Sequence, residues 1–345
     1  MKRFIQVCSI AFCLYGFSGP TTAMTFKIAT LAPAGTVWMV EMKNGAKLIH
    51  EKTDGRVKFK FYPGGVMGGE KTVHQKIRAG QLHGGAFSSA GLAHLYPDIQ
   101  SLNIPMMFDS LDEVDYVRAK MEPQMKANLE QRGFVLLGIT EIGFSLLLSK
   151  TPIRDLASIQ GSKLWAPQGD VMVQETYRSL GLSPVSLPIS DVYTGLQTGL
   201  LETVTATPSA AIAFQWHSST GYVTATPLAY LVGLLAIDKR AFDKISVADQ
   251  SIVRQEMESA LGRLDRLTRA DNLEAAAALR SQGIKFIEPE PDEVARWKAL
   301  AKQSIEPLID RGALTRAGVD EVRRHLRDFR QQARHDPVVT NDKLP

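Results

Sequence analysis

Hydroxyl and imidazole side chains capable of catalysis occur in this sequence, but not in the spacing that an active site would need. Ser88 and Ser89 follow a strand-like segment, yet the G-x-S-x-G pattern of a serine hydrolase is missing and no obvious base lies near them in the sequence. The seven histidines are scattered, without the paired spacing of a catalytic zinc site. The spacing therefore argues against a serine hydrolase and a zinc enzyme, and we expect no metal ion and no cofactor.

A glycine-rich stretch, residues 64–69, precedes Glu70. It has neither the lysine–serine pair of a nucleotide-binding P-loop nor the spacing of a dinucleotide-binding turn. We expect a tight turn that presents backbone N–H groups, with Glu70 at the N-terminus of a helix, where the helix dipole favours a carboxylate. Glu70 is also a candidate to face a ligand.

The first residues predict export from the cytoplasm. Lys2 and Arg3 precede an apolar run, residues 4–17, and small residues before and at Ala23 suit cleavage after that position. A membrane anchor is the alternative, but the run is shorter than the roughly 20 residues that span a bilayer. We expect a mature chain that begins at residue 24 and lies in the periplasm.

Cysteine content and charge exclude several classes of protein. Both cysteines, Cys8 and Cys13, lie in the predicted signal peptide, so the mature chain has no disulfide and no thiol nucleophile. Loss of Lys2 and Arg3 lowers the formal net charge from +4 to +2, and the remaining charges are interspersed along the chain. Nucleic acid is therefore not an expected partner.

Strand and helix patterns alternate along the mature chain. Residues 26–31 and 57–61 are typical of strands, and apolar residues between Trp38 and Ile49 recur at helical spacing. Two short strands are predicted at 134–139 and 145–148. Repeated βαβ units predict an α/β fold with a mainly parallel sheet covered by helices. The mature chain is longer than the roughly 250–300 residues that one core serves, so we expect two lobes with a ligand cleft between them.

The lobes are predicted to exchange segments. The expected assignment is residues 24–145 and 234–270 for lobe I, and residues 146–233 and 271–334 for lobe II. The chain is expected to cross near residues 143–150 and to return near 230–235. The C-terminal third is predicted to be helical from a capping box at Ser246, with another helix at 292–308, and to brace the hinge. Residues 335–345 are expected to form a frayed tail.

Several segments, taken in order, resemble the solute-binding proteins of TRAP transporters, over essentially residues 26–290. Such proteins have a two-lobed Venus-flytrap fold, bind organic acids between the lobes and deliver them to a two-component membrane permease. The resemblance therefore implies a carrier without catalysis. The segments that carry it are ATLAPAGTVW (29–38), YPGGVMGGE (62–70), IRAG (77–80), IPMMF (104–108), GSKL (161–164), GLSPV (181–185) and DVYTGLQTG (191–199).

The same comparison implies an unusual ligand site. In most members an arginine clamps the ligand carboxylate, but Trp165 stands at that position, and Ser145 stands where some members have another arginine. The family's asparagine-containing segment is replaced by one that includes Thr205, Ala206 and Thr207. The cleft should be less polar than usual.

Two explanations for the missing arginines stay open. A buried carboxylate without a charged partner costs several kcal/mol, so either another cation compensates or the ligand is not a simple carboxylate. Arg78 is a candidate cation, but its position at a helix end suits a solvated side chain better. An extracytoplasmic sensor component and a periplasmic enzyme are the alternative functions.

Further candidates come from aromatic residues and strand ends. Trp165 could stack on an aromatic or alicyclic ligand or bind a cation through its π system, or else pack in the core of lobe II. Gln168 is expected at the start of the next helix, and Ser88 ends a strand of lobe I, where α/β sheets place ligands. Trp38 and Trp216 would complete an aromatic box, unless they pack in the core.

Overall fold

The computed structural model describes residues 23–335. The predicted signal peptide before Ala23 and the predicted tail after His335 lie outside the described residues. His335 itself is the last residue of a helix and was predicted to belong to the tail. Within residues 23–335, no helix combines the length and the apolar character needed to cross a membrane.

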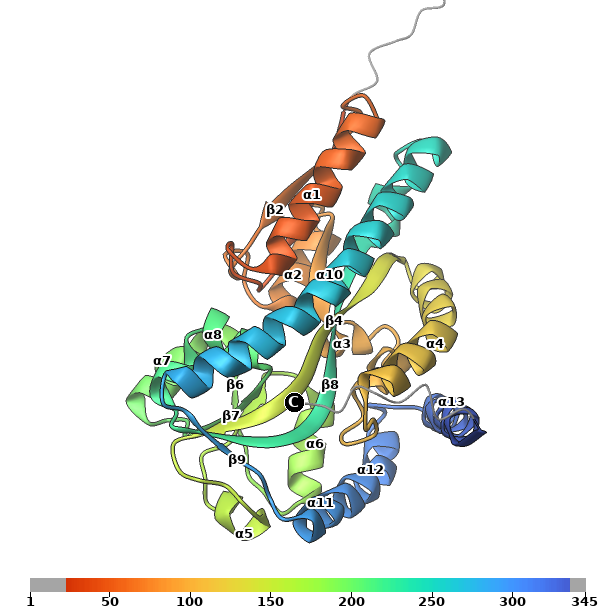
Figure 1. The fold of residues 1–345 in the computed structure, drawn as a ribbon. Coiled ribbons are helices and arrows are strands. Elements are labelled where there is room, and N and C mark those ends of the chain that lie inside the picture. The colour runs from red at the N-terminus through yellow and green to blue at the C-terminus, as the bar shows by residue number, and fades with distance from the viewer. Residues whose placement is uncertain (1–22, 336–345) are drawn as a thin grey trace, which may run out of the picture.

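The chain alternates strands and helices, as the periodicity predicted (Figure 1). The strands are β1 (Met24–Ala29), β2 (Val57–Tyr62), β3 (Gly84–Ser88), β4 (Phe134–Ser149), β5 (Trp165–Pro167), β6 (Val185–Leu187), β7 (Thr203–Ala206), β8 (Tyr222–Asp238) and β9 (Lys285–Ile287). The helices are α1 (Val37–Lys52), α2 (Glu70–Arg78), α3 (Ser89–Ala93), α4 (Leu111–Gln131), α5 (Leu156–Ile159), α6 (Val171–Ser179), α7 (Val192–Thr198), α8 (Pro208–Ala213), α9 (Lys239–Phe242), α10 (Val247–Ser281), α11 (Pro291–Gln303), α12 (Ile305–Asp310) and α13 (Arg316–His335). Short 3₁₀ helices are η1 (Pro97–Asn103), η2 (Ile189–Asp191) and η3 (Trp216–Ser219).

The main sheet has the strand order β2-β1-β3-β8-β4-β7, with β9 beside β8. Strand β1 pairs in parallel with β2 and β3, as the βαβ pattern predicted. Strand β8, however, is antiparallel to both β3 and β4, and β4 is antiparallel to β7. The prediction of a mainly parallel sheet is therefore wrong for its centre, because the chain passes between the lobes once in each direction.

Strands β4 and β8 connect the two halves of the molecule. They pair along their whole length, from Phe134 opposite Asp238 to Ser149 opposite Tyr222, and three register shifts interrupt the ladder. Bulges of this kind bend a strand and increase its twist. Figure 1 shows the two strands passing together from the upper half to the lower half. Both predicted crossings between the lobes fall on this pair of strands. Strand β4, however, is one continuous strand where two short strands were predicted. The predicted lobe boundaries stay a prediction.

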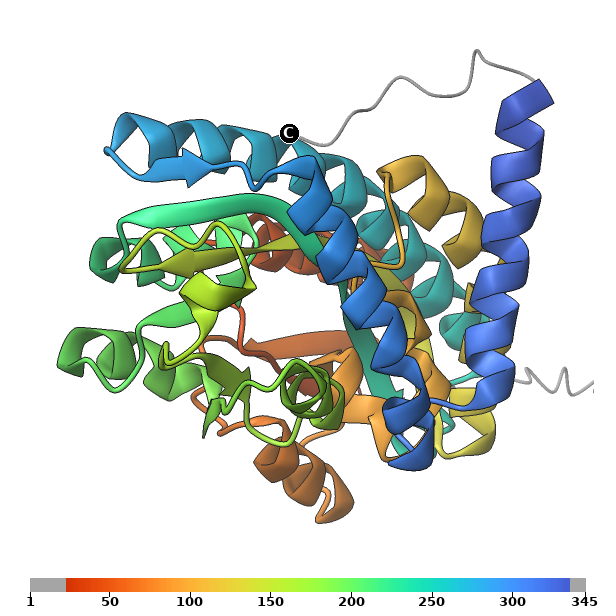
Figure 2. The same cartoon turned by 90° about the horizontal axis from the view of Figure 1, so that it is seen from below.

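Helix α10 is the brace that the C-terminal third was expected to supply. It packs against α1 and β4 and, near its other end, against α8 (Figures 1 and 2). The Ser246 side chain caps it by accepting a hydrogen bond from Asp249 N at 3.1 Å. The predicted helix at 292–308 is interrupted at Ser304, where α11 gives way to α12. Helix α13 packs on α4 and η1.

Apolar residues on β8 alternate between two cores, as the period of a strand requires. Leu234 and Ala236 belong to a core under α4 and η1, whereas Leu235 and Ile237 belong to a core under α1 and α10. A further core fills the lower half and includes Trp165.

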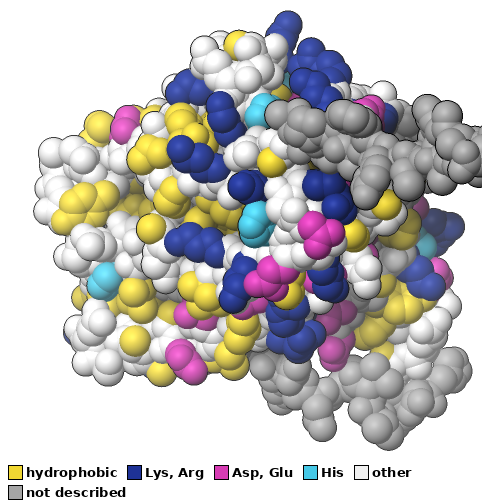
Figure 3. All heavy atoms as spheres, turned by 90° about the horizontal axis from the view of Figure 1, so that it is seen from above, with side chains coloured by type: hydrophobic (Ala, Val, Ile, Leu, Met, Phe, Trp, Pro, Cys, Tyr) yellow, Lys and Arg dark blue, Asp and Glu magenta, His cyan; other side chains and the backbone are white. Residues whose placement is uncertain are grey.

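Basic and acidic side chains are mixed on the face seen from above (Figure 3). Three ion pairs attach α10 to α1 and the turn after it: Lys52 Nζ lies 2.6 Å from Glu256 Oε1, Arg263 Nε lies 3.0 Å from Glu41 Oε2, and Arg56 donates to both oxygens of Asp249. Pairs with one exposed partner contribute about 0–1 kcal/mol each. The apolar contacts between the two helices therefore carry most of the attachment.

Polar side chains of α10 fasten the middle of β4. Asp265 accepts hydrogen bonds from Thr140 Oγ1 at 2.9 Å and from Glu141 N at 2.7 Å. About two turns further along α10, Asn272 Nδ2 donates to Ile142 O at 2.9 Å. These bonds satisfy backbone groups that the register shift at this point leaves without a strand partner.

Gly143 allows this attachment, and its substitution tests it. Its φ is +111°, and a Cβ built on it would lie 2.7 Å from Asn272 Nδ2. We expect Gly143→Ala to lower the free energy of unfolding by about 3 kcal/mol, as measured by urea denaturation. Gly133→Ala is the matched control, because Gly133 also has a positive φ (+89°) but nothing within 4 Å of the added atom; it should cost about 1 kcal/mol. If the two variants lost the same free energy of unfolding, the packing of Asn272 against Gly143 would not contribute to stability.

Candidate functional site

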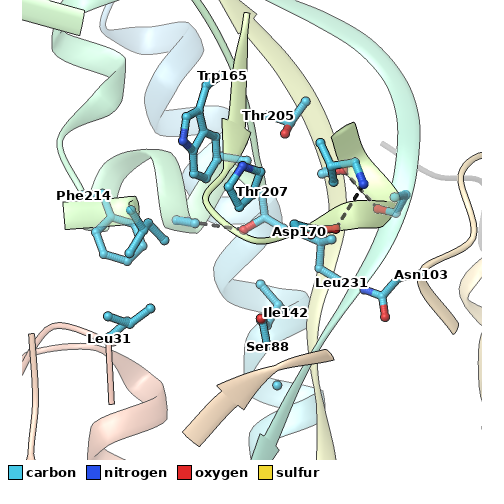
Figure 4. A pocket seen from close by; sticks show the side chains of 18 of the residues that line it. Leu31, Ser88, Asn103, Ile142, Trp165, Asp170, Thr205, Thr207, Phe214 and Leu231 are labelled. Atoms are coloured by element: carbon cyan, nitrogen blue, oxygen red, sulfur yellow. Dashed lines mark hydrogen bonds between the residues drawn. The ribbon is translucent and has the colours of Figure 1, made fainter. Parts of the chain in front are cut away.

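A cavity of about 1280 Å³ lies between the two halves of the molecule. Figure 4 shows Leu31 and Ser88 on one side of it and Trp165 and Phe214 on the other. All ten site residues predicted from the sequence line this cavity: Trp38, Glu70, Ser88, Ser145, Trp165, Gln168, Thr205, Ala206, Thr207 and Trp216. Arg78 does not line it and is exposed, in agreement with the solvated role expected for it.

Strand ends and helix starts form much of the lining. Ser88 ends β3 and caps α3, with its Oγ accepting from Gly91 N at 3.2 Å. Ala206 ends β7, and Thr207 caps α8 through a bond from Ala210 N at 3.3 Å. Open α/β sheets place ligands at such ends. Each lobe therefore lines the cavity with the end of a strand and the start of the helix that follows it.

Glu70 lies at the first position of α2 and is held by Ser88. Its carboxylate accepts hydrogen bonds from Ser88 N and, at 2.9 Å, from Ser88 Oγ. Burial raises the pKa of Glu70 to about 7, although these hydrogen bonds act in the opposite direction. A Cβ at position 91 would lie 2.6 Å from Glu70 Oε2, so Gly91 is the residue type that fits there.

Asp170 is a second carboxylate at the cavity, and our sequence analysis did not select it. It caps α6 by accepting from Val173 N at 3.0 Å, and burial raises its pKa to about 6. Its charge also raises the pKa of Glu70. The signal in the sequence was an aspartate two residues after Gln168, at the first position of a segment with helical spacing, where a capping side chain is common. Two carboxyl groups, one from each lobe, thus face the same cavity.

Three aromatic residues form one wall. The Trp165 ring meets the Trp216 ring edge to face at 5.1 Å between centroids, and Phe214 stacks on Trp216 at 5.3 Å. Trp165 is 4% exposed and its Nε1 donates to Leu187 O at 2.9 Å. Trp165 and Trp216 each line the cavity and are also part of a buried core, so the core interpretation holds, while contact of either ring with a ligand stays a prediction. The sequence analysis missed Phe214, because an apolar residue two positions before Trp216 has no spacing that distinguishes a cavity residue from a core residue.

The remaining predicted residues differ in what they can offer. Ser145 is buried and its hydroxyl already donates to Ala229 O at 3.2 Å. Gln168 is exposed, and its side chain makes no hydrogen bond to another of the described residues. Its backbone N donates to Leu187 O. Trp38 is partly buried against Phe61. Which of these groups contact a ligand stays a prediction.

The charges that line the cavity are mostly negative. Within residues 23–335, the one basic side chain in the lining is Lys71, and it is exposed. Six carboxylates line the same space: Glu70, Glu141, Asp170, Asp191, Asp271 and Glu274. The described residues contain no cluster of three or more His, Cys, Asp or Glu side chains able to hold a metal ion.

The family model for "Bacterial extracellular solute-binding protein, family 7", known as DctP, matches residues 28–311. The chain belongs to this family. A relative, the 2,3-diketo-L-gulonate-binding periplasmic protein YiaO of Escherichia coli, is 24% identical over 280 residues, which are 80% of this chain and 85% of the relative. The resemblance seen in the sequence is therefore confirmed, and this family member is a substrate-binding receptor of a transporter and not an enzyme.

Solved structures share the two-lobed fold. The sugar acid binding protein DctPAm of Advenella mimigardefordensis, in complex with galactonate, has a TM-score of 0.83 at 19% identity, covering 89% of this chain and 99% of that one. A TRAP periplasmic solute binding protein of Desulfovibrio salexigens with bound orotic acid has a TM-score of 0.81 at 16% identity, covering 89% and 99%. The predicted α/β fold with long C-terminal helices is confirmed.

The raised pKa of Glu70 predicts a pH dependence of stability. Because the folded-state pKa is raised from 4.5 to about 7, the folded state holds the proton more tightly, and the free energy of unfolding should fall as the pH rises between these values. Each unit of difference corresponds to about 1.4 kcal/mol. We expect Glu70→Gln to show a smaller fall than the native protein in urea unfolding between pH 4.5 and 7.

Asp191→Asn is the control variant for this experiment, because it removes one exposed carboxylate at the cavity rim and leaves Glu70 in place. If Glu70→Gln and the native protein lose stability to the same extent over this pH range, Glu70 is ionised throughout and the account of its burial is wrong.

Proposed function

We propose that this solute-binding protein captures a small organic molecule in the cavity between its lobes and delivers it to the membrane permease subunits of a TRAP transporter. The observation that carries the proposal is the convergence on one cavity of ten residues chosen from the sequence, spread from Trp38 to Trp216. We further propose cleavage after Ala23 and action in the periplasm.

The bend for closure would lie in β4 and β8. A ligand that contacts both lobes stabilises the closed form by its differential affinity for that form, with burial of apolar lining as the main favourable term. The register shifts in β4 offer places where the strands change direction with little loss of backbone hydrogen bonds. The permease would then recognise the closed form.

The ligand contacts that we propose are the ten predicted residues, with Asp170 and Phe214 added from the structure. The aromatic wall would cover an apolar part of the ligand, and Glu70 with Gln168 would contact its polar part. Ser145 would contribute shape more than hydrogen bonding, because its hydroxyl is already satisfied.

A thermal-shift screen of purified mature protein, residues 24–345, tests this function. The compounds should include dicarboxylates, sugar acids, keto acids, aromatic acids, neutral compounds and amines. A ligand at one hundred times its Kd stabilises the folded state by about 2.7 kcal/mol, so a specific ligand should raise Tm clearly. A protein that no compound class stabilises would contradict the proposal.

Phe214→Ala tests the aromatic wall. Since Phe214 is partly buried beside Trp216, we expect affinity for a compound from the screen to fall about tenfold, or 1.4 kcal/mol, with a moderate loss of Tm. Calorimetric titration measures the first effect. Tyr193→Ala is the matched control, because Tyr193 is an exposed aromatic residue of lobe II outside the cavity lining. An unchanged affinity in Phe214→Ala would remove this wall from the binding site.

A further inference from the structure

Two of the cavity carboxylates, Glu70 and Asp170, are held by hydrogen bonds and have no positive partner within residues 23–335. Glu70 is bound by Ser88 N–H and O–H groups, and Asp170 by the Val173 N–H group. No cation contributes to the pKa of either carboxyl group, and burial raises both values. A buried carboxylate normally pairs with a charge. Each of these groups would therefore gain from a positive charge supplied from outside the chain.

Three of the helix starts around the cavity are capped by the chain's own side chains: Thr36 caps α1, Asp170 caps α6 and Thr207 caps α8. The start of α2 has no side-chain cap from the described residues. Glu70 stands in the first turn of α2. Asp170 and Glu70 are carboxylates, so they offset the positive ends of α6 and α2.

The arginines behind β4 are also occupied. Arg118 is bound by Glu122 and Asp265, and Arg269 by Asp115 and Glu141. Neither arginine lines the cavity. Lys71 does line it, but an exposed ammonium group surrounded by water contributes little to an ion pair. A ligand carboxylate would thus meet more negative than positive charge.

Two buried polar atoms in the lining have no partner within the described residues: Asn103 Oδ1 and Thr176 Oγ1. Asn103 is 8% exposed and Thr176 is 7% exposed. Figure 4 shows the Asn103 amide and Asp170 bordering the same space. An unmade hydrogen bond at a buried acceptor is costly, so a bound water molecule or a polar group of a ligand would stabilise the chain at these atoms. An ammonium group offers three donors and no acceptor.

We propose that the ligand carries a cationic nitrogen on an apolar or aromatic body. The nitrogen lies between Glu70 of lobe I and Asp170 of lobe II, with Asn103 as an additional acceptor. The body lies against Phe214 and Trp216, whose rings also attract a cation. The inference rests on the proposed function of the cavity and specifies the chemical class of its ligand. It is opposite in charge to the organic acids bound by the solved relatives.

Matched compounds test the charge preference. One set shares an indole body (tryptamine, indolepropionate and indolepropanamide) and another shares a cyclohexane body (cyclohexylethylamine, cyclohexylpropionate and cyclohexylpropanamide). Calorimetric titration into purified residues 24–345 gives Kd for each. We expect the amine of at least one set to bind about tenfold tighter than its carboxylate, a difference of 1.4 kcal/mol.

Variants assign the preference to residues. Glu70→Gln and Asp170→Asn should each weaken amine binding about tenfold and leave amide binding unchanged; Asn caps a helix as well as Asp, so α6 is retained. Lys71→Met is the control and should not weaken amine binding. Loss of carboxylate binding in Lys71→Met would instead assign Lys71 as the ligand's partner and overturn the inference.

The results separate the inference from the proposed function. If carboxylates bind and no amine does, in the matched sets and in the broad screen, the inference is wrong and the proposed function stands. If nothing binds, both fail. Amine binding that Glu70→Gln and Asp170→Asn leave unchanged would also overturn the inference, because the two carboxylates would not contact the nitrogen.

Discussion

The antiparallel pairing of β4 with β8 is the constraint on which the rest of the structure depends. The pair is continuous from Phe134–Asp238 to Ser149–Tyr222, so both walls of the cavity are attached to one ribbon of two strands. Register shifts interrupt its ladder near the middle, where α10 binds the backbone through Asp265. Small bends in two continuous strands can therefore move whole walls toward each other, while each lobe keeps its own core.

The cavity obtains its character from the way the helices around it begin. Helix starts need groups that accept hydrogen bonds from their N–H donors, and here the chain supplies them from its own side chains. Asp170 caps α6 and Glu70 lies in the first turn of α2, and both bring negative charge into a space that Trp216 and Phe214 otherwise make apolar. Stability of the helices and the charge of the binding site are thus set by the same residues.

Sequence reasoning found the walls of the site because their positions follow from local rules. Ser88 ends β3, Thr207 follows β7 and Glu70 follows a glycine turn. Strands β3 and β7 run in opposite directions along the β4–β8 pair, so their carboxyl ends face one space. Sequence reasoning failed where long-range geometry decides: the direction of β8 depends on which lobe the chain returns to, and local periodicity is the same for both directions. Phe214 has no distinctive spacing, and local pattern could not decide between cavity wall and core for Trp165, because a wall residue can also fill a core.

Hydrogen–deuterium exchange, with and without the tightest-binding compound from the thermal-shift screen, tests most directly whether a ligand is held between the lobes. The account predicts slower exchange in both walls at once, in residues 86–91 of lobe I and 165–173 of lobe II, with α13 unchanged as an internal reference. Protection confined to one wall, or found mainly in α13, would contradict a ligand site formed by two lobes on the β4–β8 ribbon.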